Sequence, residues 1–223
     1  MQFAPKVRNV LTMAVLAIAV STAGGLSPAW SAEAAAPDAA ATPAVGTETA
    51  AQREIARAVQ NVYPALVRIY VVMNEPDDGQ MRKLSGAGSG AIISEDGYVV
   101  TNHHVAGNAA RIVCNLSDQE EIEAHLVGTD ALADIAVIKL DLSSRPKDAK
   151  PLSVAAWGDS DKVRVGDVVF AMGCPAAVSQ SITRGIVSNT QLIMPRGMGG
   201  AFRLDGENVG SIVRWLAHDA IIF

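Results

Sequence analysis

Short runs of valine and isoleucine, separated by glycine, aspartate, asparagine and proline, recur through most of the chain after residue 62. Runs of this length, with turn-forming residues about every 8 to 12 positions, predict antiparallel β-strands. The segment Ser94–Tyr98 places an Asp-Gly turn between two of these runs, which indicates a hairpin. The predicted strands are Leu66–Met73, Gly90–Ser94, Tyr98–Thr101, Arg111–Leu116, Glu121–Val127, Ile135–Leu140, Val168–Met172 and Ser181–Thr190.

The strands fall into two groups, because a stretch rich in serine, proline and charged residues interrupts them at 141–152. Six of the predicted strands lie in the first unit, at about 62–141, and six strands can close a small barrel. The second unit, at about 154–223, contains only two or three clear strands. We therefore expect an all-β fold in which a first barrel is complete and a second barrel is incomplete.

Two segments have apolar residues at helical spacing. Gln52–Asn61 carries Ile55 and Val59 near a period of 3.6 residues, and Pro64 prevents a longer helix. The segment Glu207–Leu216 also has helical spacing and predicts a second short helix.

The first 31 residues have the pattern of a secretory signal peptide. Lys6 and Arg8 precede the apolar run Val10–Val20, and a stretch rich in serine, glycine and proline follows, ending at Ala29-Trp30-Ser31. The run is shorter than the roughly 20 residues that span a bilayer, so we expect cleavage and export to the periplasm or medium. An uncleaved membrane anchor is the alternative. Residues 32–51, rich in alanine, proline and threonine, are typical of a flexible linker, and 52–223 are expected to form the folded domain.

Charge and composition exclude several functions. The net charge is −5, and removal of the predicted signal peptide, which holds two cations and no anions, leaves −7. Nucleic-acid binding requires a basic cluster, and the sequence has none. The four histidines and two cysteines lack metal-binding spacing, so no metal is expected. Cys114 and Cys174 either form a disulfide or are separate buried thiols, and their spacing leaves both alternatives open.

Two residues at the ends of predicted strands are candidates for catalysis. His104 follows the strand Tyr98–Thr101, and Asp134 precedes the strand Ile135–Leu140. A histidine titrates near pH 6.5 and can accept a hydroxyl proton at neutral pH, while a carboxylate can orient it. The structural alternatives are a hydrogen-bonded histidine and a turn aspartate, although Asp130 fits the turn better.

The residues around this pair resemble the trypsin-like serine proteases of the HtrA/DegP type. The resemblance implies a chymotrypsin/trypsin-like double β-barrel without a metal or organic cofactor. It further implies that His104 is the catalytic base and Asp134 its orienting carboxylate, with His103 at a variable position. The similar segments occur in the same order in the chain, at Gly88–Ile93, Thr101–Val105, Asp130–Lys139, Gly158–Asp167, Ala171–Pro175 and Ser181–Ser188.

The nucleophile of such a protease is not found within residues 1–223, which contain no Gly-x-Ser-x-Gly stretch. Ser160 follows Gly158, but Asp161 and Lys162 come next in place of the glycines that form an oxyanion hole, so we expect a turn residue. Asp219 lies in a segment that resembles the one shortly before the family's nucleophile, and we expect it to be structural. The printed chain is therefore expected to be an inactive fragment whose serine follows Phe223.

The resemblance implies an exported serine endopeptidase that hydrolyses peptide bonds of unfolded proteins, with polypeptides as its partners. Members of the family commonly form trimers and carry PDZ domains. The alternative is a catalytically inactive, protease-like module that binds extended or unfolded polypeptides. The intact pair of His104 and Asp134 favours the enzyme, because a binding module needs no general base.

Overall fold

The computed structural model describes residues 48–77, 80–174, 180–193, 203–204, 207–208 and 213–222. The predicted signal peptide, and the predicted linker as far as residue 47, lie outside the described residues. Within the described ranges, none of the helices combines the length and apolar character needed to cross a bilayer.

Helix α1 spans Ala50–Val62 and begins at a capping box. The Thr49 hydroxyl accepts a hydrogen bond from the Gln52 backbone N–H at 3.2 Å, and the Gln52 side chain accepts one from the Thr49 N–H at 2.8 Å. A short 3-10 turn, η1 (Tyr63–Ala65), follows and leads into the first strand. The predicted first helix is therefore present, and it starts two residues earlier than expected, inside the predicted linker.

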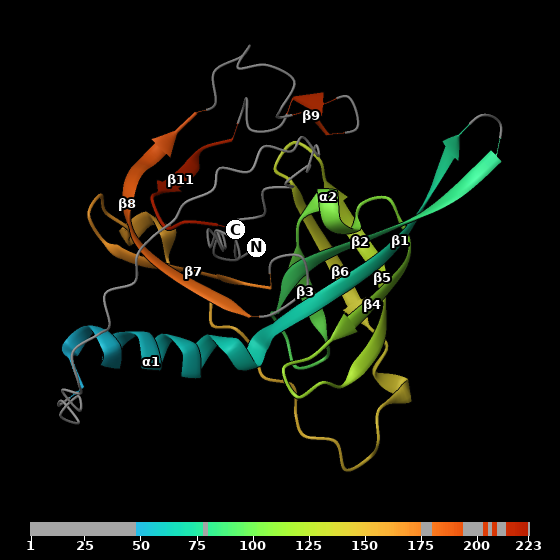
Figure 1. The fold of residues 1–223 in the computed structure, drawn as a ribbon, viewed down its shortest axis with the longest axis horizontal. Helices are drawn as coiled ribbons and strands as arrows, with labels where there is room; N and C mark the ends of the chain where they lie inside the picture. Colours follow the sequence, from blue (N-terminus) through green and yellow to red (C-terminus); the bar gives the residue numbers. More distant parts are fainter. Residues whose placement is uncertain are drawn as a thin grey trace, which may run out of the picture.

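Six antiparallel strands form a closed barrel in the order β1-β2-β3-β6-β5-β4 (Figure 1). The predicted hairpin turn is present: Gly97 has a φ of +90°, and the Ile93 N–H donates to the Tyr98 carbonyl at 2.8 Å. The closed barrel agrees with the six strands predicted between 62 and 141. The strands are β1 (Leu66–Asp77), β2 (Gln80–Ile92), β3 (Tyr98–Thr101), β4 (Ala109–Asn115), β5 (Glu121–Asp130) and β6 (Ile135–Leu140).

The barrel core consists of aliphatic side chains from alternate strand positions. On β1, Val67, Ile69 and Val71 all point inward and are at most 3% exposed. Ile138 on β6 is completely buried in the same cluster. Each fully buried side chain of this kind contributes about 1.5–3 kcal/mol to stability, so the barrel is a rigid base for the residues at its ends.

Strand β2 is longer than predicted. The prediction began at Gly90, whereas β2 begins at Gln80 and pairs with β1 continuously from Asp77↔Gln80 to Leu66↔Ala91. The outer part of this hairpin extends away from the barrel (Figure 1). Its sequence is polar and rich in glycine, so it carries no hydrophobic signal, and backbone hydrogen bonds to β1 determine its conformation.

The second unit contains an open three-stranded sheet in the order β11-β8-β7 (Figure 1). Over the described residues, the fold is therefore a closed barrel followed by a partial second sheet, which confirms the predicted all-β class. The elements of this part are η2 (Leu142–Ser144), η3 (Ser160–Lys162), β7 (Val168–Gly173), β8 (Ser181–Leu192), β9 (Arg203–Leu204), β10 (Glu207–Asn208) and β11 (Trp215–His218).

The predicted helix at Glu207–Leu216 is wrong where the structure describes it. Glu207–Asn208 forms a strand that pairs with β9, and Trp215 pairs with Leu192 of β8. A helix of ten residues has few internal hydrogen bonds and is marginal without packing of its apolar face. Pairing with β9 and with β8 occupies the described residues at the two ends of this segment instead.

Candidate functional site

The candidate site lies where β3 ends and β6 begins. These strands are antiparallel neighbours, with Thr101 opposite Ala136. The short helix α2 (His103–Ala106) starts directly after β3, and its first turn carries His104. This register brings His104 next to Asp134, which lies thirty positions later in the chain, just before β6.

His104 and Asp134 form a hydrogen-bonded pair. His104 Nδ1 is 2.8 Å from Asp134 Oδ2 and 3.1 Å from Oδ1, and the His104 backbone N–H donates to Oδ1 at 3.0 Å. The side chains are 25% and 15% exposed, respectively. Because the carboxylate occupies Nδ1, Nε2 is the ring nitrogen left for proton transfer.

The environment of Asp134 favours its ionised form. Partial burial raises the pKa of the carboxyl group, but hydrogen bonds from the His104 side chain and backbone, and from Asn102, lower it. The lowering prevails, so the pKa of Asp134 lies below its ordinary value of 3.8. A carboxylate that stays ionised at neutral pH can hold the imidazole in one tautomer and stabilise the imidazolium ion.

Asn102 is a site residue to which the sequence assigned no role. It is 8% exposed, and its side-chain Nδ2 donates to the Asp134 backbone carbonyl at 2.9 Å and to Asp134 Oδ2 at 3.1 Å. It precedes α2, at the position where an asparagine ordinarily caps a helix. The contact with Asp134 follows from the β3–β6 register.

Helix α2 packs against β2 through the contact between Val105 and Gly88. A Cβ atom added to Gly88 would lie 2.6 Å from Cγ2 and 2.7 Å from Cγ1 of Val105. This position therefore requires glycine, because any side chain would push away the helix that carries His104. His103 faces a different environment: it is 5% exposed, and its Nδ1 lies 2.5 Å from the Thr129 hydroxyl of β5.

The other residues considered from sequence have structural contacts. Ser160 begins η3, whose capping residue Asp159 accepts a hydrogen bond from the Asp161 N–H at 3.1 Å. Asp130 accepts hydrogen bonds within the turn after β5 from two backbone N–H groups, at 2.9 and 3.2 Å. Asp219 accepts one from the Ile186 N–H at 2.6 Å. Ser160 therefore lies in a turn, Asp130 closes a turn, and Asp219 anchors the chain to β8.

The two cysteines are free thiols and both are buried. Cys114 belongs to the barrel core, whereas Cys174 follows β7 and donates its backbone N–H to the Ser89 hydroxyl at 2.7 Å. Of the two alternatives that the sequence left open, a disulfide or two separate buried thiols, the structure therefore has the separate thiols.

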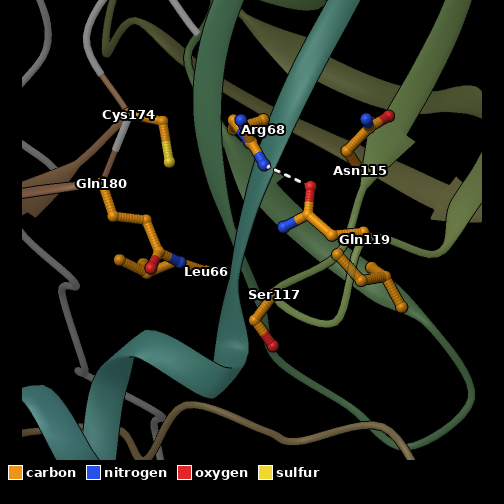
Figure 2. A pocket seen from close by; sticks show the side chains of 8 residues that line it. Leu66, Arg68, Asn115, Ser117, Gln119, Cys174 and Gln180 are labelled. Carbon is orange, nitrogen blue, oxygen red and sulfur yellow. Dashed lines mark hydrogen bonds between the residues drawn. The ribbon is translucent and has the colours of Figure 1, made fainter. Parts of the chain in front are cut away.

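Cys174 also lines a pocket of about 240 Å³ between the start of β1, the β4–β5 turn and the end of β7 (Figure 2). Arg68 Nη2 donates to Gln119 Oε1 at 2.9 Å within it. The pocket includes neither His104 nor Asp134. In the part of the chain that the structure describes, no group of three or more histidine, cysteine, aspartate or glutamate residues could hold a metal ion.

Known proteins are similar to this chain in sequence and in fold. The family model for the trypsin-like peptidase domain matches residues 88–220. A probable periplasmic serine endoprotease, DegP-like, from Pseudomonas putida (strain W619) is 39% identical over 152 residues, which cover 60% of this chain and 30% of the relative. The relative of the same name from Pseudomonas savastanoi pv. phaseolicola is 43% identical over 109 residues, covering 49% and 21%.

Among solved structures, the HtrA-type protease AlgW with a decapeptide superposes with a TM-score of 0.55 at 30% identity, covering 75% of this chain and 51% of that one. The chain spans about 30% of the length of its first curated relatives. The matched residues contain both members of the His104–Asp134 pair. The resemblance inferred from the sequence is therefore confirmed: this chain belongs to the trypsin-like peptidase family and is of the HtrA/DegP type.

Proposed function

We propose that this chain carries the base and the orienting carboxylate of an exported serine endopeptidase. His104 is the general acid and base, and Asp134 orients it. The observation that carries the proposal is the 2.8 Å contact between His104 Nδ1 and Asp134 Oδ2 in a fold of the HtrA/DegP type.

The proposed reaction is peptide hydrolysis through an acyl-enzyme. His104 Nε2 accepts the hydroxyl proton of a serine while the serine oxygen attacks the scissile carbonyl carbon. The imidazolium, stabilised by Asp134, then gives this proton to the leaving amine as the C–N bond breaks. A water molecule next attacks the acyl carbon while His104 takes one of its protons. The C–O bond to the serine then breaks, and His104 gives this proton to the serine oxygen. We do not propose any serine of residues 1–223 as the nucleophile.

Unfolded polypeptides in the periplasm are the proposed substrates. Two observations support this: the curated relatives are named periplasmic serine endoproteases, and AlgW was solved with a decapeptide. Assembly as a trimer and cleavage of the signal peptide stay predictions.

Histidine substitutions in the product of the complete coding sequence test the assignment. The readouts are casein cleavage and labelling by a fluorophosphonate probe, which reacts with activated serines. His104→Ala should lower kcat by about 10⁴-fold or more, because triad members act as a unit. His103→Ala should lower it by less than about tenfold, or 1.4 kcal/mol of barrier.

His125→Ala is the matched control, because His125 is exposed on β5. It should leave kcat unchanged. Equal losses from His103→Ala and His104→Ala, with both variants folded by circular dichroism, would contradict the assignment of the base. A product that binds unfolded casein but neither cleaves it nor labels would support the inactive binding module instead.

A further inference from the structure

We infer that Asn102 is a positioning residue for the His104–Asp134 pair: its side-chain amide holds Asp134 in the backbone conformation that directs the carboxylate at His104. The inference rests on the proposed function of this pair, and it adds a residue that acts through Asp134 without touching the substrate.

Asp134 needs such support because its backbone is unusual. Its φ of +51° lies in the left-handed region, which is unfavourable for residues with a Cβ atom, although aspartate tolerates it better than most. The hydrogen bond of its own turn, from the Asp134 N–H to the Ala131 carbonyl, is long at 3.4 Å. The turn alone therefore holds this conformation weakly.

Asn102 supplies the missing restraint from the neighbouring strand end. A side-chain amide has two N–H donors on one nitrogen, and both acceptors of Asn102 Nδ2 belong to Asp134: its backbone carbonyl at 2.9 Å and its Oδ2 at 3.1 Å. One amide therefore contacts both the backbone and the carboxylate of the same residue, which restrains the direction of the side chain.

The amide of Asn102 is used for Asp134 and not for helix capping. Asn102 occupies the N-cap position of α2, yet its side chain makes no capping hydrogen bond. Asparagine at this position ordinarily stabilises a helix through such a bond. The side-chain oxygen of Asn102, Oδ1, is buried and has no hydrogen-bond partner among the described residues. Reversing the amide would place this oxygen against the Asp134 carboxylate, so electrostatic repulsion selects the orientation that donates to Asp134.

The restraint reaches His104 directly. The Asp134 carboxylate receives three kinds of donor: Asn102 Nδ2 and His104 Nδ1 at Oδ2, and the His104 backbone N–H at Oδ1. Loss of the Asn102 amide leaves the strained turn to relax, and the carboxylate then turns away from the imidazole. It also removes one of the hydrogen bonds that lower the pKa of Asp134.

Asn102→Ser separates positioning from capping. Serine is as good an N-cap residue as asparagine, but its short side chain has one donor and cannot reach both acceptors of Asp134. Asn102→Ala also removes the contacts with Asp134, and it places at the N-cap position a residue that cannot cap the helix. Asn115→Ala is the control, because Asn115 is at the far end of β4 from α2. Circular dichroism verifies that each variant of the 223-residue chain is folded.

Two NMR measurements on the chain test the inference. The first is the carboxyl ¹³C shift of Asp134, followed with pH. The acid dissociation constant of Asp134 should be about three- to tenfold lower in Asn102→Ser and Asn102→Ala, which means a higher pKa, as expected for one lost hydrogen bond. The low-field proton signal of His104 Nδ1–H should weaken in both variants. Asn115→Ala should change neither. An unchanged Asp134 titration, or a serine variant that fails to fold, would overturn the inference.

Kinetics of the complete gene product provide an independent measurement. Asn102→Ser should lower kcat about ten- to hundredfold at unchanged KM, as expected for a misplaced catalytic group. A change in KM alone would count against the positioning role. If the unsubstituted product has no activity, the proposed protease function fails, and the NMR titration still decides the role of Asn102.

Discussion

Replacing Gly88 by alanine should displace the helix that carries His104. Gly88 lies on β2 directly beneath Val105 of α2, the residue that follows His104. The added methyl group would lie 2.6 and 2.7 Å from the two Val105 methyl carbons and 3.3 Å from its Cβ. Carbon atoms ordinarily approach to about 3.5–4.0 Å, so either β2 or α2 must move by close to 1 Å.

The magnitude follows from this overlap. Overpacking of a well-packed core typically costs about 1–3 kcal/mol, and we expect Gly88→Ala to lower the free energy of unfolding by that amount. Val105 is 5% exposed, so Val105→Ala alone removes two buried methyl groups and should cost about 1.5–3 kcal/mol. In the double variant, the new methyl fills space that Val105 has vacated. The two costs should therefore not add, with a coupling energy of about 1 kcal/mol or more.

Urea unfolding followed by circular dichroism measures these free energies, and the His104 Nδ1–H signal reports on the site. Gly128→Ala is the matched control, because an added Cβ there would meet no atom within 4 Å and Gly128 has no positive φ. We expect that control to change stability by no more than about 0.5 kcal/mol. Equal effects of Gly88→Ala and Gly128→Ala, or additive costs in the double variant, would refute the steric argument.

Three other expectations follow from burial and charge. Because the pKa of Asp134 is lower in the folded chain, the ionised carboxylate stabilises the fold above about pH 4, and this contribution is lost as the pH falls through the folded pKa. Urea titrations at pH 6 and pH 3 should therefore show a smaller loss of unfolding free energy in Asp134→Asn than in the unsubstituted chain. Burial raises the pKa of Cys114 to about 12, so mass spectrometry should detect its alkylation by iodoacetamide at pH 8 only after unfolding. Glu120→Gln should lower the free energy of unfolding in urea by about 1–3 kcal/mol. The reason is that Arg145 Nη2 lies 2.6 Å from Glu120 Oε2, and the two side chains are only 12% and 22% exposed. A decrease of less than about 0.5 kcal/mol would contradict this.

The local sequence pattern was sufficient to predict the bounds of strands that have turns at both ends. Strands β3 and β6 have the predicted bounds, because each is a short β-branched run between residues that favour turns. The predictions at Glu207–Leu216 and for the outer half of β2 failed where pairing with another strand, and not local preference, determines the backbone conformation. Long-range pairing outweighs helical spacing in so short a segment.

The same division applies to the candidate site. His104 and Asp134 were predicted as a pair from sequence because the segments around them resemble those of the HtrA/DegP family, and the structure places them in contact. The role of Asn102, the left-handed conformation of Asp134 and the packing of Gly88 against Val105 became visible only in the folded chain. Each depends on which atoms meet across neighbouring strands. That is determined by the register of the closed barrel, which brings together residues that the sequence separates by between 17 and 32 positions.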